Sequence, residues 1–250
     1  MRPLILVTND DGIQSEGLRA LATALREVGD VTIVAPDREQ SASSHSLTLH
    51  RPLRINKIEP GSYAVEGTPT DCVYIATRSL MKGDGRPALV CSGINKGSNL
   101  GDDIHYSGTV SAAFEGTVLG IPSMAVSMVG RGPYQFKTAA DFAAKLARRM
   151  LEEKLPGDTL LNVNVPNVEP GKITGVAITR MGKRHYGDAV VENVDPRGRK
   201  YYWIGGAELD AEDIKGSDCN AVLETKISVT PLHLDLTNYA AIDRLSGWKL

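Results

Sequence analysis

Two adjacent carboxylates, Asp10 and Asp11, are the sharpest chemical feature of this sequence. They directly follow an apolar run over residues 4–7, which predicts a buried strand, and Gly12 comes after them. Two ionised carboxylates in a crowded loop repel each other unless a cation neutralises them, so the pair predicts a site for a hard divalent ion. The alternative is that the aspartates cap the next helix and that Gly12 makes the turn.

A second polar loop follows the apolar run over residues 31–35 and contains several hydroxyl side chains, including Ser41. If both runs are parallel strands, this loop leaves the sheet at the same edge as the aspartates. Its hydroxyls could then reach a metal or a phosphate. The alternative is a surface loop that is merely polar.

The third loop, over residues 92–103, is rich in glycine and asparagine. Glycine lets the backbone approach a ligand closely, and the amide oxygen of Asn95 suits a hard cation. Asn95 is therefore a candidate for the metal and for the substrate phosphate. Lys96 could neutralise a phosphate, or it is simply a solvated lysine.

The segment Ser107-Gly108-Thr109 opens a predicted helix. Free backbone amides and the positive end of the helix dipole favour an anion there, and the hydroxyls of Ser107 and Thr109 add donors, so we expect a phosphate site. The alternative is that Ser107 or Thr109 only caps the helix. His105, just before this segment, is a weaker candidate for a general acid.

Short apolar runs alternate with helical patterns through the first two thirds of the chain, which places these loops on one sheet. Because parallel strands need crossover connections, the alternation predicts an α/β fold with a doubly wound, mostly parallel, Rossmann-like sheet. The expected strands cover residues 4–7, 31–35, 63–65, 88–91, 124–128 and 160–165, and the expected helices cover 18–28, 68–81, 110–118 and 139–152.

The pattern changes near residue 167. Strands are expected over residues 173–179, 200–204 and 227–230 and a helix over 239–248, joined by polar connections. We interpret residues 1–166 as the catalytic core. Residues 167–250 form a C-terminal extension with an antiparallel or hairpin region and a terminal helix.

Composition narrows the class of protein. The 250 residues carry 28 basic and 30 acidic side chains, so a net charge of -2 gives no general attraction to duplex nucleic acid or an anionic membrane. The longest apolar stretch, over residues 118–129, is too short and too interrupted to span a membrane. The three cysteines lie far apart and form no CxxC pair, so we expect reduced thiols and a cytoplasmic protein.

Six polar motifs of this sequence match those of one known family: Asn9-Asp10-Asp11-Gly12, Ala35-Pro36-Asp37-Arg38 with Ser41, Gly67-Thr68-Pro69-Thr70-Asp71-Cys72, Ser92-Gly93-Ile94-Asn95, Asn99-Leu100-Gly101-Asp102-Asp103 and Tyr106-Ser107-Gly108-Thr109-Val110. On these motifs the whole chain resembles the SurE (survival protein E) family. The resemblance implies a SurE-like fold and a metal-dependent nucleoside monophosphate phosphatase. It also implies that Asp10, Asp11, Ser41 and Asn95 hold the metal, and that the C-terminal part builds a homodimer or homotetramer.

The leading hypothesis is therefore a phosphatase that releases phosphate from nucleoside monophosphates, a 5′-nucleotidase with 3′-nucleotidase activity as a further option. One divalent ion, Mg²⁺ or Mn²⁺, suits the all-oxygen ligand set, and water attacks with Asp10 or Asp11 as ligand and base. One alternative makes Asp10 a covalent nucleophile. Another is a nucleotide-binding regulatory module without turnover. A dinucleotide-dependent oxidoreductase is excluded, because the first turn lacks GxGxxG.

Overall fold

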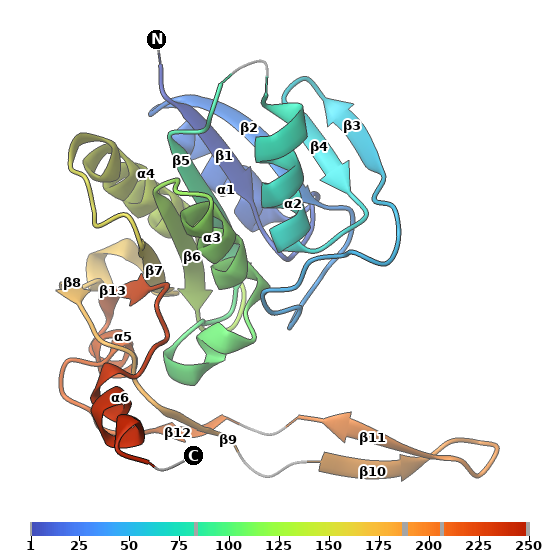
Figure 1. Ribbon diagram of the computed structural model, residues 1–250, viewed down its shortest axis with the longest axis vertical. Helices are drawn as coiled ribbons and strands as arrows, with labels where there is room; N and C mark the ends of the chain where they lie inside the picture. Colours follow the sequence, from blue (N-terminus) through green and yellow to red (C-terminus); the bar gives the residue numbers. More distant parts are fainter. Residues whose placement is uncertain (1, 83–84, 187–189, 206–207, 249–250) are drawn as a thin grey trace.

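The computed structural model describes residues 2–82, 85–186, 190–205 and 208–248 (Figure 1). A nine-stranded sheet lies between two layers of helices, in the order β3-β4-β2-β1-β5-β6-β7-β13-β8. Its centre is a parallel block of six strands, β1 (Leu4–Thr8), β2 (Asp30–Pro36), β4 (Ser62–Val65), β5 (Leu89–Lys96), β6 (Ser123–Val129) and β7 (Thr159–Pro166). The predicted doubly wound parallel sheet is confirmed.

Both ends of the sheet carry antiparallel pairings. At one edge, β3 (Ile55–Glu59) runs antiparallel to β4. At the other, β13 (Lys226–His233) runs antiparallel to β7, and β8 (Gly175–Ile178) pairs with β13 in parallel. The sequence pattern missed β3 because its five residues are exposed and form no apolar run.

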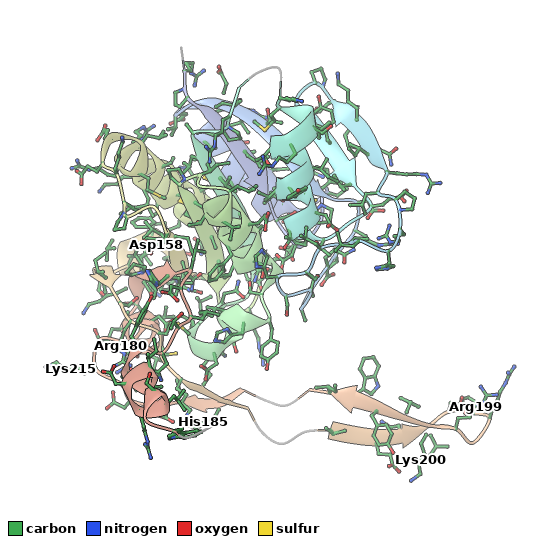
Figure 2. The ribbon with its side chains drawn as sticks, in the orientation of Figure 1. Asp158, Arg180, His185, Arg199, Lys200 and Lys215 are labelled. Atoms are coloured by element: carbon green, nitrogen blue, oxygen red, sulfur yellow. The ribbon has the colours of Figure 1, made fainter. Side chains whose placement is uncertain are left out.

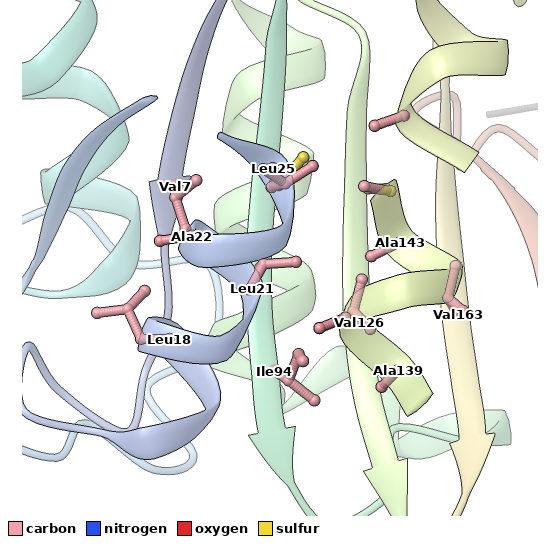
Figure 3. Packing of buried hydrophobic residues seen from close by; sticks show 14 of the residues in the cluster. Val7, Leu18, Leu21, Ala22, Leu25, Ile94, Val126, Ala139, Ala143 and Val163 are labelled. Carbon is pink, nitrogen blue, oxygen red and sulfur yellow. The ribbon is translucent and has the colours of Figure 1, made fainter. Parts of the chain in front are cut away.

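Helices cover both faces of the sheet. The helices α1 (Glu16–Leu25) and α4 (Phe136–Glu152) pack together on one face, where Leu18 and Leu21 of α1 and Ala143 of α4 meet Val7 and Val126 of the sheet (Figure 3). The helices α2 (Pro69–Ile75) and α3 (Gly108–Val118) cover the other face. Alternate residues of the buried strands therefore pack into cores on opposite faces of the sheet, which keeps the strand ends in fixed positions.

The expected helix over residues 68–81 begins as predicted, because Thr68 and Asp71 form a capping box. It ends as α2 at Ile75, and a π-helical turn, Ala76–Leu80, continues it. Three further short helices are present: η2 (Gly101–His105), η3 (Pro170–Lys172) and α5 (Asp218–Leu223). These were not predicted, since so few residues show no helical period.

The C-terminal third contains the expected hairpin, in which β10 (Val190–Val194) pairs antiparallel with β11 (Lys200–Ile204) and extends away from the body (Figure 1). At its base, β9 (Arg184–Tyr186) pairs with β12 (Glu208–Ala211). The terminal helix α6 covers Tyr239–Ser246. None of the helices in the described residues is long and apolar enough to cross a membrane.

Helix α1 lies unusually close to β5, just before the third polar loop. A β-carbon at Gly17 would collide with the carbonyl oxygen of Ile94 and would lie 3.2 Å from the Phe136 ring. The absence of a side chain at residue 17 therefore sets the distance between α1 and the strand that ends in Asn95 and Lys96.

We predict that Gly17→Ala destabilises the protein by roughly 1 to 3 kcal/mol, although alanine favours helices, because the backbone of α1 or β5 must shift. Gly157→Ala is the matched control, since a β-carbon there would have no neighbour within 4 Å. Urea denaturation of both variants tests this. Equal stabilities of the two variants would contradict the close packing.

Candidate active site

The polar loops after β1, β2 and β5 meet in one hollow at the carboxyl ends of the parallel strands. Its volume is about 1020 Å³, and its lining includes Asp10, Asp11, Ser41, Asn95 and Ser107. Strands β1 and β5 are neighbours, with Thr8 paired to Ser92, so the carboxylates and Asn95 emerge side by side. All four predicted metal ligands thus share one hollow.

The carboxylate of Asp10 is buried at the start of α3. Its Oδ1 accepts a hydrogen bond from the Thr109 hydroxyl. Burial raises the pKa of Asp10 from 3.8 to about 6, the bonds from Thr109 oppose this shift, and the charge of Asp11 adds to it. A carboxylate that is costly to ionise in this position favours a nearby cation.

Gly108 makes room for this buried carboxylate. A β-carbon at residue 108 would lie 2.8 Å from the Asp10 Cβ and 2.8 Å from the Ser43 Oγ. The glycine is therefore required for the contact between α3 and Asp10, whatever ligand approaches the helix.

The hydroxyls of Ser107 and Thr109 bond within the protein, and the role of Ser107 as a helix cap is one of the two alternatives that the sequence left open. Ser107 is the N-cap of α3, and its Oγ accepts a hydrogen bond of 3.0 Å from the backbone N–H of Val110. The Thr109 hydroxyl, which we predicted to face a phosphate, donates to Asp10 instead. Thr109 is fully buried, so its side chain orients the carboxylate.

The aspartates do not cap the first helix. Ser15 is the N-cap of α1, and its Oγ accepts from the Leu18 N–H. The turn at Gly12 is as expected, with a φ of +92°. Asn9, whose role the sequence did not reveal, donates to the Gly12 carbonyl and to Ser15, and thereby holds the turn in shape.

Asp11 is less enclosed than Asp10. Burial raises its pKa, while the backbone N–H and the charge of Lys96 lower it. The backbone nitrogen of Lys96 donates to the Asp11 Oδ2 at 3.3 Å. Lys96 also lines the hollow, so a positively charged side chain lies beside the residues predicted to bind the metal and the phosphate.

Asn95 and Ser41 complete the oxygen donors. The Asn95 amide nitrogen donates to the Gly97 carbonyl at 3.1 Å, which leaves its Oδ1 as the atom available to a ligand. The Ser41 hydroxyl donates to Glu39 at 2.6 Å, and its oxygen keeps lone pairs that can face a cation.

The lining of the hollow also includes Tyr106, Arg184, Asp103 and Ile204, and we call these four residues the far wall. Arg184 forms an ion pair with Asp103 and donates to the Ser98 hydroxyl at 3.0 Å. Tyr106 is 67% exposed, which leaves an aromatic face open to a ligand. His185 lies near the base of the hairpin, whereas Lys200 and Arg199 lie towards its far end (Figure 2).

Buried asparagines fix the backbone next to Ser98, the hydrogen-bond partner of Arg184. The Asn99 N–H donates to Asn164 Oδ1 at 2.9 Å, and the amide groups of Asn162 and Asn164 both donate to the Asn99 carbonyl. The signal in the sequence was two asparagines at alternate positions of an apolar strand, but only the structure shows their common partner. His105 lies outside this arrangement, in a second hollow of about 720 Å³.

The side-chain atoms that could bind a metal ion indicate which kind of ion the site would take. The described residues contain no group of three His, Cys, Asp or Glu side chains that could hold a metal, so a nitrogen or sulfur site is not found in this part of the chain. The four predicted ligands in the hollow instead offer two carboxylates, one hydroxyl and one amide oxygen. These residues fit a hard divalent cation such as Mg²⁺ or Mn²⁺.

Comparison with known proteins agrees with this geometry. The family model described as survival protein SurE matches residues 5–188. This chain belongs to the SurE family. The crystal structure of the SurE protein from Aquifex aeolicus superimposes with a TM-score of 0.88 at 46% sequence identity, covering 98% of both chains.

Curated SurE relatives match the chain over nearly its whole length. The 5′-nucleotidase SurE of Geobacter sulfurreducens is 57% identical and aligns over 98% of this chain and 94% of its own length. That of Myxococcus xanthus is 55% identical over 98% and 93% of the two chains. The alignments therefore include the C-terminal third.

The raised pKa of Asp10 predicts how the stability of the metal-free protein depends on pH. Below pH 3.8 the carboxyl is neutral in both states, and above about pH 6 ionisation costs the folded state on the order of 2 to 3 kcal/mol. Asp10→Asn should therefore stabilise the protein by that amount at pH 8 and hardly at all at pH 4. Urea denaturation with a chelator measures both. An equal gain at the two pH values would refute this assignment.

Proposed function

We propose that this protein is a divalent-metal-dependent phosphatase that hydrolyses nucleoside monophosphates to nucleoside and phosphate, as a 5′-nucleotidase. The observation that carries the proposal is the carboxylate pair Asp10 and Asp11, in a hollow shared with Ser41 and Asn95 and large enough for a nucleotide. The names of the relatives support the same reaction.

Asp10, Asp11, Ser41 and Asn95 would hold one Mg²⁺ or Mn²⁺. A divalent ion bound there would neutralise the carboxylates and polarise the phosphoryl oxygens. Thr109 fixes the orientation of Asp10, and Asn9 fixes the turn that presents Asp11. The protein's own contribution is thus a preorganised set of oxygen donors.

For the phosphate we propose the start of α3 over Ser107, Gly108 and Thr109, together with Asn95. The Thr109 hydroxyl takes no part in this, because it donates to Asp10. The positive end of this helix dipole faces the hollow, where Ser107 and Asn95 are lining residues. Lys96 adds a positive charge. Water is the nucleophile, and Asp10 or Asp11 takes its proton.

Direct attack by Asp10 on phosphorus is less favoured by the geometry. One carboxylate oxygen already accepts the Thr109 hydroxyl, and the other would hold the metal. A covalent nucleophile needs a free oxygen in line with the leaving group. The regulatory alternative is unsupported, since the relatives are named as nucleotidases.

The remaining volume of the hollow would hold the nucleoside. Bases stack on aromatic side chains and on arginine, and Tyr106 and Arg184 both belong to the far wall. Stacking on an exposed ring does not distinguish the hydrogen-bonding edges of the bases, so these residues would accept several bases.

We propose a homodimer or homotetramer assembled through the extension over residues 167–250, with residues 1–166 as the catalytic core. The hairpin strands β10 and β11 carry exposed apolar side chains, among them Val191, Tyr202 and Trp203. All three cysteines are free thiols, which fits a reducing compartment, and we propose the cytoplasm.

The metal assignment predicts graded losses. Asp10→Asn and Asp11→Asn should each lower turnover of AMP at least about 100-fold, since one charge leaves a hard-cation site, whereas Asn95→Ala and Ser41→Ala should mainly raise the Mn²⁺ concentration needed for half-maximal rate. Asp141→Asn on the exposed face of α4 is the control. Near-normal turnover of both aspartate variants at limiting Mn²⁺ would disprove the proposal.

If the far wall binds the base, a change at Tyr106 should alter the affinity for substrate and leave kcat unchanged. Tyr106→Ala should raise KM for AMP several-fold, because a base typically gains about 1 to 3 kcal/mol from an aromatic partner. Ribose 5-phosphate, which has no base, should keep its KM. If both substrates lose affinity equally, Tyr106 does not face the base.

A further inference from the structure

A side-chain hydrogen bond joins the second polar loop to α3, the helix behind the site. The His45 Nε2 lies 2.9 Å from the Glu115 Oε2, and the Glu115 side chain is only 6% exposed. Within the described part of the chain, this is the one side-chain hydrogen bond of that carboxylate. The His45 ring also contacts Phe114 of α3, with 6.2 Å between the ring centroids.

The loop that ends in His45 has an unfavourable backbone. Ala42 and Ser44 have φ values of 55° and 52°, in the left-handed region that side chains other than glycine rarely adopt. Such conformations persist only where the surrounding contacts hold them, and they concentrate at functional sites. His45 directly follows the second of these residues.

Several hydrogen bonds contribute to the shape of this loop, among them those from the Ser46 N–H to the Ser44 carbonyl at 3.1 Å and from the Ser46 hydroxyl to the Ser43 carbonyl at 2.8 Å. The Gln40 N–H donates to the Asp10 carbonyl at 2.8 Å, and the Ser44 N–H donates to the Tyr106 carbonyl at 3.2 Å. Ser41 itself is exposed, and its hydroxyl bonds to Glu39 of the same loop. The position of the Ser41 oxygen is therefore set by the loop backbone between Gln40 and His45.

We propose that His45 is a positioning residue for the metal site, and that its bond to Glu115 clamps the Ser41 loop onto α3. This inference rests on the proposed function, because it requires Ser41 to be a metal ligand. His45 lines the second hollow and not the one that contains Asp10, so it acts through the loop and does not touch the substrate.

The test is a double-mutant cycle on Mn²⁺ binding, measured by calorimetry with the full chain and without substrate. His45→Ala should weaken Mn²⁺ binding about three- to tenfold, and no more than Ser41→Ala does. Added to Ser41→Ala, it should cause no further loss, because both changes remove the same ligand. His50→Ala, an exposed histidine of the same segment, is the matched control and should bind Mn²⁺ normally.

A second pair of variants separates positioning from stability. His45→Ala leaves the buried Glu115 carboxylate unpaired and should lower Tm, whereas His45→Ala with Glu115→Gln should regain Tm because the charge is gone. If His45 positions the loop, Mn²⁺ binding by that double variant stays weak. Recovery of Mn²⁺ affinity together with Tm would overturn the inference.

The outcomes also distinguish this inference from the proposed function. If the wild-type protein does not bind Mn²⁺, the proposed function fails. If Ser41→Ala binds Mn²⁺ normally, Ser41 is not a ligand and the inference falls with it. If Ser41→Ala is weakened but His45→Ala binds like the wild type, only the role of His45 is refuted.

Discussion

The buried carboxylate of Asp10 against the start of α3 is the interaction on which the site depends. It requires Thr109 as a donor and glycine at residue 108, because a side chain there would reach the Asp10 Cβ. Burial destabilises the ionised form of Asp10, and the helix dipole and the Thr109 hydroxyl offset only part of this destabilisation. In the proposed metal site a cation would supply the remainder, so metal affinity and folding energy would be coupled through one side chain.

Much of the fold followed from local patterns. Apolar runs such as residues 4–7 and helical spacing such as residues 139–152 correspond to β1 and α4, because buried strands and amphipathic helices must show these periods. The rule that ligands bind at the carboxyl ends of parallel strands placed Asp10, Asp11 and Asn95 at one edge. Strand order and the exposed strand β3 carry no comparable local signal.

The finer roles depended on contacts distant in sequence. Thr109 lies 99 residues from Asp10, and Asn162 lies 63 residues from Asn99, so no spacing rule connects either pair. Ser107 was predicted both as a cap and as a phosphate ligand, and only coordinates show that its oxygen accepts the Val110 N–H. Residue types therefore predicted the chemistry of the site better than the partner of each side chain.

The asparagine cluster beneath the far wall has a consequence for dynamics. The Asn99 amide proton is shared with a side chain of β7, a central strand, and Asn99 itself is buried. Opening that segment would break three buried hydrogen bonds at once, so local fluctuations should seldom release it. Amide exchange at Asn99 should therefore be among the slowest in the protein.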